Sequence, residues 1–154
     1  MNKSNLIIRP IEPNDRTHWL VMWQAYLHFY EQSLAPEVTE ATWARFFDDS
    51  CSLYCLVGED ESLGLVGFAV HVVHPGSWGA GNVCYLEDLY VRPEARRMGV
   101  ARKLIEQLIT DGKEKDWYRL YWHTDKENHS ARALYDTMAT LADRVKYDIE
   151  LQGN

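Results

Sequence analysis

The sequence predicts a single mixed α/β domain, in which helices flank a central sheet. Segments with strand and helix periodicity follow in the order strand, two helices, three strands, helix, strand, helix, strand. The chain has 154 residues, a length that suits one domain with a sizeable core. Hydrophobic residues make up 46% and charged residues 25%, which is ordinary for a soluble globular protein. We therefore expect one domain over residues 1–154, with no linker or internal repeat.

The first expected elements are a short strand and two helices. Residues 6–10 are apolar at first and end in a proline, which favours a strand that stops there. Pro13 suits the first turn of a helix, and large apolar side chains then recur at helical spacing to about Gln32. Thr39 is expected to cap a second helix that ends near Asp49.

The middle of the chain predicts a hairpin followed by another strand. Residues 53–59 and 65–73 are strand-like, with turn residues between them. Residues 74–81 contain three glycines and are expected to form a loop. Residues 85–91 are again apolar enough for a strand, which Pro93 closes because proline has no N–H to donate.

A helix that follows this strand begins with small residues and nearby arginines. From Val100 the apolar positions recur at helical spacing, so we expect an amphipathic helix with one buried face. The first N–H groups of a helix have no partner inside it, and its dipole leaves a partial positive charge there. Gly99 and Ala101 would let a ligand approach these amides, and arginines add full charges at positions 96, 97 and 102. This arrangement suits a phosphate or pyrophosphate, although such helix starts are also common without one.

The remaining segments predict one more pair of strands around a short helix. Asp111 and Gly112 are expected to end the long helix before Lys115. Residues 119–123 are rich in aromatic side chains and favour a strand. Residues 130–138 suit a short helix, and residues 144–151 alternate enough for a closing strand.

Composition narrows the classes of partner. The formal net charge is −7, which argues against nonspecific binding of nucleic acid and favours cationic small molecules or basic peptides. Three cysteines at 51, 55 and 84 have no metal-ligand spacing, so we expect no metal and a reducing cytoplasm. No apolar run is long enough to span a bilayer, and no membrane association is expected.

The helix start differs from two well-known phosphate loops and resembles a third. It lacks a Gly-Lys-Ser/Thr ending and a three-glycine fingerprint, which disfavours an ATPase or a nicotinamide enzyme. Arg96-x-x-Gly99-x-Ala101 after an apolar strand resembles the acetyl-CoA pyrophosphate loop of the GNAT superfamily of N-acetyltransferases. Downstream, Asn128-x-x-Ala131-x-x-Leu134-Tyr135 resembles the next motif of that superfamily. The resemblance covers about residues 53–151.

The resemblance implies a geometry and a set of ligand-binding residues. Strands 85–91 and 119–123 of a mostly antiparallel sheet should splay apart, with acetyl-CoA in the opening. The main chain of Leu89 and Val91 should pair with the pantetheine arm, which Asn128 also contacts. The pyrophosphate loop implied by the resemblance comprises Arg96, Arg97, Met98, Gly99, Val100, Ala101 and Arg102.

The resemblance also implies catalytic and acceptor residues. Tyr135 matches the tyrosine that protonates the departing CoA sulfur, and packing of a half-buried core aromatic is the alternative interpretation. Tyr26 and Tyr30 either pack on the sheet or help to line the acceptor pocket. Leu86-Glu87-Asp88 resembles some spermidine/spermine acetyltransferases, in which the glutamate is assigned as the base.

A base is chemically useful because an ammonium with a reference pKa near 10.4 is rarely deprotonated at pH 7. Glu87 is our first candidate for this base, with a structural carboxylate as the alternative interpretation, and Asp88 is the second candidate. Adjacent side chains on a regular strand point to opposite faces, so we expect only one of the two to face the cleft.

We therefore expect an acetyl-CoA-dependent N-acetyltransferase in which a primary amine attacks the thioester directly. The leading acceptor is a small polyamine or an amino-acid-like amine. Alternatives are acetylation of a lysine or N-terminus on a basic protein, a CoA-binding regulatory module without catalysis, and a scaffold that binds no acetyl-CoA. The sequence looks most like a branch with fungal acetyltransferases of histones, polyamines or D-amino acids, which implies a homodimer.

Overall fold

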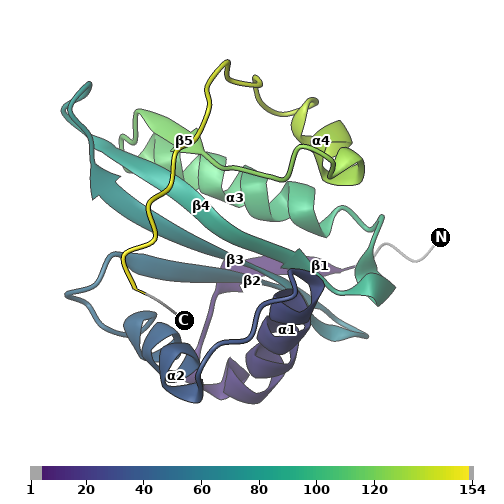
Figure 1. Ribbon diagram of the computed structural model, residues 1–154. Coiled ribbons are helices and arrows are strands. Elements are labelled where there is room, and N and C mark those ends of the chain that lie inside the picture. Colours follow the sequence, from purple (N-terminus) through teal and green to yellow (C-terminus); the bar gives the residue numbers. More distant parts are fainter. Residues whose placement is uncertain (1–4, 153–154) are drawn as a thin grey trace. The chain divides into compact units, whose positions relative to one another are not determined.

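A five-stranded sheet in the order β1-β2-β3-β4-β5 is the centre of the larger of two units in this computed structural model (Figure 1). The structure describes residues 5–152; the first unit ends at His123 and the second starts at Thr124. The strands are β1 (Leu6–Pro10), β2 (Leu53–Asp60), β3 (Gly64–Pro75), β4 (Asn82–Val91) and β5 (Arg119–Tyr121). The first four pair antiparallel in succession, and β5 joins β4 in parallel. The predicted mixed, mostly antiparallel sheet is thus confirmed.

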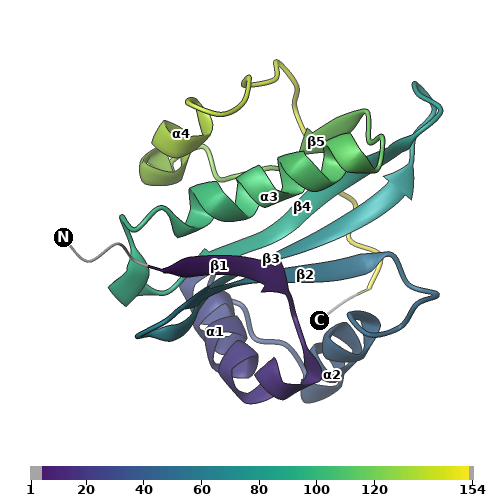
Figure 2. The same cartoon turned by 180° about the vertical axis from the view of Figure 1, so that it is seen from behind.

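Helices cover both faces of this sheet. The helices of the first unit are α1 (Arg16–Phe29), α2 (Pro36–Arg45) and α3 (Val100–Glu114), with short 3-10 turns η1 (Pro13–Asp15) and η2 (Pro93–Ala95). The two views show α1 and α2 on one face and α3 on the other (Figures 1 and 2). Trp19 of α1 is fully buried and stacks on Trp23, and both rings contact Phe68 of β3. Trp19 and Trp23 of α1 therefore form part of the core on that face.

The bounds of α2 and the place of Gly112 inside α3 differ from the predictions, although α3 does end before Lys115. Helix α2 begins at Pro36, because proline suits the first helical position, and Thr39 lies inside the helix instead of capping it. The Thr39 hydroxyl accepts a hydrogen bond of 3.3 Å from the indole N–H of Trp23. Helix α3 continues through Gly112, where a Cβ would lie 2.9 Å from the Trp117 ring. A glycine that lets an aromatic ring pack closely was mistaken for a helix end.

The second unit contains α4 (His129–Tyr135), which confirms the short helix. The closing strand expected over residues 144–151 is absent, because within residues 5–152 that segment pairs with no strand. Its apolar side chains are largely exposed: Val145 80%, Tyr147 91%, Ile149 85% and Leu151 90%. Alternation alone does not make a strand, since the backbone also needs a partner and the apolar face needs a covering layer.

An ion-pair network ties the chain that leads into α1 to the sheet. Arg9 of β1 donates two hydrogen bonds to the Asp15 carboxylate, of 2.8 and 2.9 Å, and a third of 2.9 Å to Glu59 of β2. The Asp15 side chain is only 10% exposed. Hydrogen bonds from Arg9 hold the pKa of Asp15 below its usual range, so this carboxylate stabilises the fold in its ionised form.

Arg9→Gln is expected to lower the free energy of unfolding at pH 7 by about 2 kcal/mol, because it leaves the Asp15 carboxylate without its charged partner. A depressed folded-state pKa contributes stability above the unfolded-state value and loses it as pH falls through the folded one. The difference between the two proteins should therefore shrink below about pH 4. Urea unfolding at pH 7 and pH 3 measures it, with Arg16→Gln in the exposed Arg16–Glu40 pair as the control. An equal effect of both substitutions would contradict the role of Arg9.

Candidate active site

Strands β4 and β5 pair over only three residues each. Val83, Cys84 and Tyr85 lie opposite Arg119, Leu120 and Tyr121. Strand β4 continues to Val91, but no strand of the described residues pairs with its second edge beyond Tyr85. The two strands therefore separate at this point, as the family resemblance implied, and β4 presents an open edge over residues 86–91.

The direction of the main-chain groups on this open edge follows from the β3–β4 register. The Arg92 N–H donates to the Val66 carbonyl at 2.8 Å, so this pair of residues is hydrogen-bonded. Opposed residues in an antiparallel ladder alternate between bonded and non-bonded pairs. Leu89 and Val91 therefore point their N–H and C=O groups away from β3 and toward the open edge. This is the orientation that strand-like pairing with an extended ligand requires.

A β-bulge places two adjacent carboxylates in one cavity. Asp88 lies opposite Val70, while Leu86 lies opposite His71, so Glu87 is an extra residue in β4. A bulge bends the strand and breaks the strict alternation of its side chains. Glu87 and Asp88 both line the same cavity, and the expectation that only one of them would face it is wrong.

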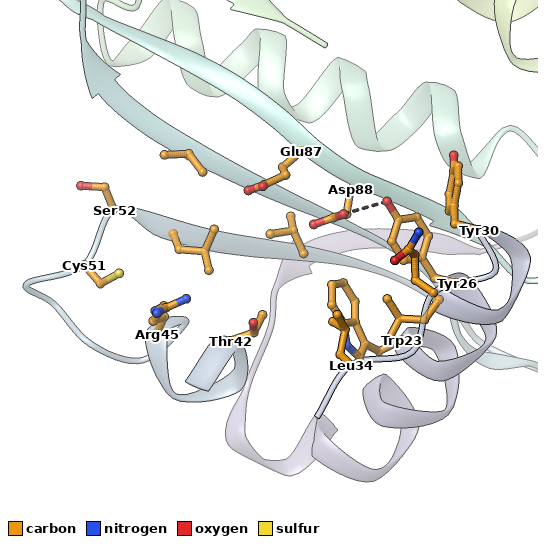
Figure 3. Close-up of a pocket in the computed structure, with 15 residues that line it drawn as sticks. Trp23, Tyr26, Tyr30, Leu34, Thr42, Arg45, Cys51, Ser52, Glu87 and Asp88 are labelled. Atoms are coloured by element: carbon orange, nitrogen blue, oxygen red, sulfur yellow. Dashed lines mark hydrogen bonds between the residues drawn. The ribbon is translucent and has the colours of Figure 1, made fainter. Parts of the chain in front are cut away.

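The cavity has a volume of about 640 Å³ and lies between the sheet and the α1–α2 side of the first unit (Figure 3). It contains Tyr26 and Tyr30, the two aromatic residues that the resemblance suggested for an acceptor pocket. Tyr26 also packs against Phe68 of β3, so its two expected roles are compatible. The lining comprises Trp23, Tyr26, Leu27, Tyr30, Gln32, Leu34, Thr42, Arg45, Cys51, Ser52, Leu53, Val70, Val72, Glu87 and Asp88.

Sequence reasoning missed Arg45, which lies at the last position of α2. A cation near a helix C-terminus is common because it offsets the helix dipole, so its position gave no sign of a pocket. It also missed the serine of the loop before β2, Ser52, which Figure 3 shows at the same end of the cavity as Cys51.

Asp88 and Tyr26 form a hydrogen-bonded pair at the wall of the cavity. The Tyr26 hydroxyl donates to Asp88 Oδ1 at 2.7 Å (Figure 3). Burial raises the pKa of Asp88 to about 6; the hydrogen bond from Tyr26 opposes this rise, and the charge of Glu87 adds to it. Burial, followed by the charge of Asp88, also raises the pKa of Tyr26 well above its usual value. Tyr26 therefore stays protonated as a donor, while Asp88 changes its charge close to neutral pH.

The loop before α3 has the backbone geometry of an anion cradle. Arg97 and Gly99 have φ angles of 65° and 78°, both in the left-handed region. The Gly99 carbonyl accepts the first helical bond, from Lys103 at 3.0 Å, so the N–H groups of Val100 and Ala101 have no acceptor within the helix. A Cβ at Gly99 would meet no heavy atom within 4 Å. The start of the helix is therefore open to a ligand, and the side chains of Arg96 and Arg97 are exposed beside it.

The position of this helix start depends on two glycines in the sheet. A Cβ at Gly58 of β2 or Gly67 of β3 would lie 3.2 or 3.0 Å from Val100 Cγ1. At Gly67 it would also lie 2.6 Å from the Tyr90 carbonyl oxygen. Val100 is 2% exposed, and it can approach the sheet this closely only because both positions lack a side chain.

The two residues predicted from the downstream motif belong to the second unit. Asn128 caps α4, because its side-chain oxygen accepts a bond of 3.4 Å from the Ala131 N–H. Tyr135 lies at the end of α4 and is half-buried. The contacts of both residues with CoA stay predictions.

Three further observations concern the cysteines, metal ligands and membrane-spanning helices. Cys51, Cys55 and Cys84 are free thiols. Within residues 5–152, no group of three or more His, Cys, Asp or Glu side chains is arranged to hold a metal ion. In the same part of the chain, no helix combines the length and the apolar character needed to cross a membrane.

Comparison with known proteins shows which family shares these features. The model of the acetyltransferase (GNAT) family matches residues 19–139. The D-amino-acid N-acetyltransferase HPA3 of Saccharomyces cerevisiae is 37% identical over 148 residues, which cover 96% of this chain and 92% of the relative. The thialysine N-epsilon-acetyltransferase of Sus scrofa is 26% identical, with coverage of 88% and 84%.

Solved structures share the fold. A ribosomal-protein-alanine N-acetyltransferase from Brucella melitensis has a TM-score of 0.80 at 21% identity and covers 95% of this chain and 99% of its own. An aminoglycoside acetyltransferase solved with a bisubstrate analogue of CoA also has a TM-score of 0.80, at 20% identity, with coverage of 96% and 99%. At such identities these likenesses support the fold alone.

Proposed function

The chain belongs to the acetyltransferase (GNAT) family of acetyl-CoA-dependent N-acetyltransferases, and we propose that its acceptor is a small primary amine bound in the cavity beside β4. The observation that carries this proposal is the presence of Glu87 and Asp88 in one cavity next to the open edge of β4. A volume of about 640 Å³ suits a small molecule. The names of the yeast and pig relatives describe amino acids as acceptors, which supports a small amine further.

Acetyl-CoA would be held by main-chain groups of the first unit. The outward N–H and C=O groups of Leu89 and Val91 suit the pantetheine amides. The open amides at the start of α3 suit the pyrophosphate, because a helix N-terminus favours negative charge. Arg96, Arg97 and Arg102 would add positive charge around it, and Asn128 is proposed to contact the pantetheine arm.

We infer direct attack of the amine nitrogen on the thioester carbonyl carbon. One ammonium proton goes to a cavity carboxylate, and the N–C bond then forms as the C–S bond breaks. The CoA sulfur receives a proton from Tyr135, and the second proton that the nitrogen loses goes through solvent to restore the Tyr135 hydroxyl. Sequence reasoning placed Glu87 first as the base. The burial of Asp88, which raises its pKa to about 6, supports the reverse order, because an effective base has a pKa near the working pH. The exposed Glu87 would then mainly attract the cationic amine.

We also propose a homodimer in a reducing cytoplasm. The three free thiols fit a reducing compartment. The exposed apolar side chains of residues 144–151 support a second copy of the chain as their cover, because a protein rarely leaves such a run in water. Sedimentation velocity of the full chain tests the dimer, and a monomer at micromolar concentration would refute it.

The function is tested by measuring CoA release from acetyl-CoA with the purified chain across spermidine, diamines, D- and L-amino acids, aminosugars and a basic peptide. We expect turnover with one class of small amine well above the others. Turnover confined to the peptide would favour the protein acceptor instead. Tight acetyl-CoA binding without turnover would favour the regulatory module, and absence of binding would overturn the family function for this chain.

Tyr135→Phe is expected to lower kcat by about 10- to 100-fold with little change in acetyl-CoA affinity, because only the proton donor to the sulfur is lost. Single-turnover kinetics and calorimetric binding of acetyl-CoA separate the two quantities. Tyr147→Phe, in the exposed C-terminal segment, is the matched control for losing a tyrosine hydroxyl. A wild-type kcat for Tyr135→Phe would remove Tyr135 as the acid.

A further inference from the structure

The cavity carries charges of opposite sign on different walls. Among its lining residues, Glu87 and Asp88 of β4 are acidic and Arg45 of α2 is basic. Figure 3 shows Arg45 on the α2 side, with the two carboxylates across the cavity on β4. Apolar side chains of β2 and β3 form another wall of the cavity, with Leu53, Val70 and Val72 among them. A small molecule that fills the cavity would therefore meet a negative end and a positive end.

Arg45 differs from the other arginines of the α1–α2 side in having no partner. Arg9 is paired with Asp15 and Glu59, and Arg16 with Glu40. Within residues 5–152, the Arg45 guanidinium makes no hydrogen bond or ion pair. An unpaired guanidinium keeps all its N–H donors available, and their planar fork matches the two oxygens of a carboxylate.

A second donor lines the same cavity as Arg45. The Ser52 hydroxyl lines the same cavity, and within the described part of the chain it has no hydrogen-bond partner. Thr42, one turn before Arg45 on α2, instead donates its hydroxyl proton to the Val38 carbonyl at 3.1 Å. The α2 end of the cavity thus offers donors from Arg45 and Ser52, whereas the β4 end offers acceptors.

We propose that Arg45 binds a carboxylate of the acceptor, so that the acceptor is an amine that also carries a carboxylate and not a polyamine. This inference rests on the proposed function, since it concerns the acceptor of the same cavity. The ammonium lies at Glu87 and Asp88, the carboxylate at Arg45 and Ser52, and the carbon skeleton along the apolar wall. Arg45 is thereby a specificity-determining residue that takes no part in the proton transfer.

A polyamine fits this charge arrangement poorly. When one of its ammonium groups lies at the two carboxylates, a second cationic group is left for the Arg45 end, where like charges repel. The acidic residues attract the ammonium group of polyamines and of amino acids alike. Arg45 repels the second cation of a polyamine and attracts the carboxylate of an amino acid. Discrimination of this kind, by one attractive and one repulsive contact, is usual in specific sites.

Arg45 has a second possible role, because a cation at the end of α2 stabilises that helix. If Arg45 only stabilised the helix, its substitution would change kcat/KM equally for every acceptor. The test therefore compares two amines that differ only in the carboxylate: lysine, in both enantiomers, and its decarboxylated form cadaverine. The same comparison is made with phenylalanine and 2-phenylethylamine, so that it does not depend on one side chain.

The experiment measures kcat/KM for each amine with the full chain at saturating acetyl-CoA. Wild-type protein is expected to prefer the amino acid of each pair. Arg45→Gln should lower kcat/KM for that amino acid by about 10- to 100-fold, mainly through KM, since it removes a charge-assisted hydrogen bond. The value for 2-phenylethylamine should stay unchanged, and the value for cadaverine should rise, because its second ammonium no longer meets a like charge at position 45. Arg45→Glu should reverse the preference, and Arg45→Lys should restore part of it.

Lys113→Gln is the matched control, because Lys113 is likewise a cation in the last turn of a helix, α3, but does not line the cavity. This variant should leave kcat/KM unchanged for both members of each pair of amines. The proposal is overturned if Arg45→Gln affects both members of a pair equally, or neither, or if wild-type protein prefers the decarboxylated amines. If wild-type protein turns over none of the amines, the proposed function itself is overturned. This outcome depends on wild-type protein alone, so it is distinct from a failure of the Arg45 proposal.

Discussion

Asp88→Asn is expected to lower kcat/KM at pH 7 by about 10²-fold or more, and to make the folded protein more stable at the same time. The loss of rate follows if Asp88 is the proposed base for the ammonium proton, because such a role is usually worth 10²–10⁴-fold. The gain in stability follows from burial, which raises the pKa of Asp88 to about 6 and so penalises its charged form.

The pH profile identifies the base. If Asp88 takes a proton from the bound ammonium, kcat/KM of wild-type protein rises to pH about 6 and then stays level until the amine itself titrates near 10. Asp88→Asn can use only the free amine, so its kcat/KM should climb about tenfold per pH unit across that range. Measurement of kcat/KM with one amine from pH 5 to 9 distinguishes the two cases: a plateau indicates that a base takes the ammonium proton, and a continuous slope indicates that only the free amine reacts.

Glu87→Gln is the control within the same bulge. The exposed Glu87 is expected to affect mainly the KM of the acceptor, so its variant should keep the plateau. If Glu87→Gln removes the plateau and Asp88→Asn retains it, Glu87 is the base, as the sequence alone had ranked it. If neither variant changes the profile, no cavity carboxylate is the base.

The effect of Asp88 on stability has a defined sign. Its folded-state pKa lies above the unfolded-state value, so its contribution to stability is complete below about pH 4 and is lost as pH rises through about 6. Asp88→Asn should therefore raise the free energy of unfolding at pH 8 by about 1–2 kcal/mol, after allowance for the weakened bond from Tyr26. Urea unfolding at pH 8 and pH 4 measures the change. A variant that is less stable than wild-type protein at pH 8 would contradict the conclusion that burial of the charged Asp88 carboxylate destabilises the fold.

Gly99→Glu is expected to weaken acetyl-CoA binding by about 100-fold, because it places a carboxylate in the open space at the start of α3. Any side chain here also strains the backbone, since the φ of 78° is left-handed, at a cost of about 1 kcal/mol. Gly99→Ala carries the strain without the charge and serves as the control. Calorimetric titration with acetyl-CoA gives the affinities.

Two results would contradict the assignment of this loop. Equal losses for Gly99→Ala and Gly99→Glu would show that strain, and not charge, determines the affinity. Unchanged affinity in Gly99→Glu and in Arg96→Ala would remove the pyrophosphate site from the start of α3.

Local patterns predicted the parts of this site that depend on local backbone structure. The amphipathic spacing after Val100 and the small residue at Gly99 located the start of α3 and its open amides. The splay of β4 and β5 came from family resemblance, and the β4–β5 pairing confirms it. The start of α3 depends on a few consecutive residues, so the sequence contains enough information to find it, whereas the splay joins two distant segments.

Features that depend on long-range packing were not predictable in this way. The bulge at Glu87 is a mismatch between two strands, and a single strand's sequence does not show which residue its partner skips. Arg45 enters the cavity through the placement of α2, which short-range spacing does not determine. Residues 144–151 have strand periodicity, but periodicity cannot supply the partner that a strand needs.

The two glycines beneath Val100 have a consequence for how this enzyme can evolve. They let the start of α3 rest on the backbone of β2 and β3, so its place is set from the face of the sheet opposite α1 and α2. Substitutions in α1 and α2 can then remodel the proposed acceptor cavity without shifting the amides at the start of α3. A methyl group added at Gly67, by contrast, would meet both Val100 of α3 and the Tyr90 carbonyl of β4.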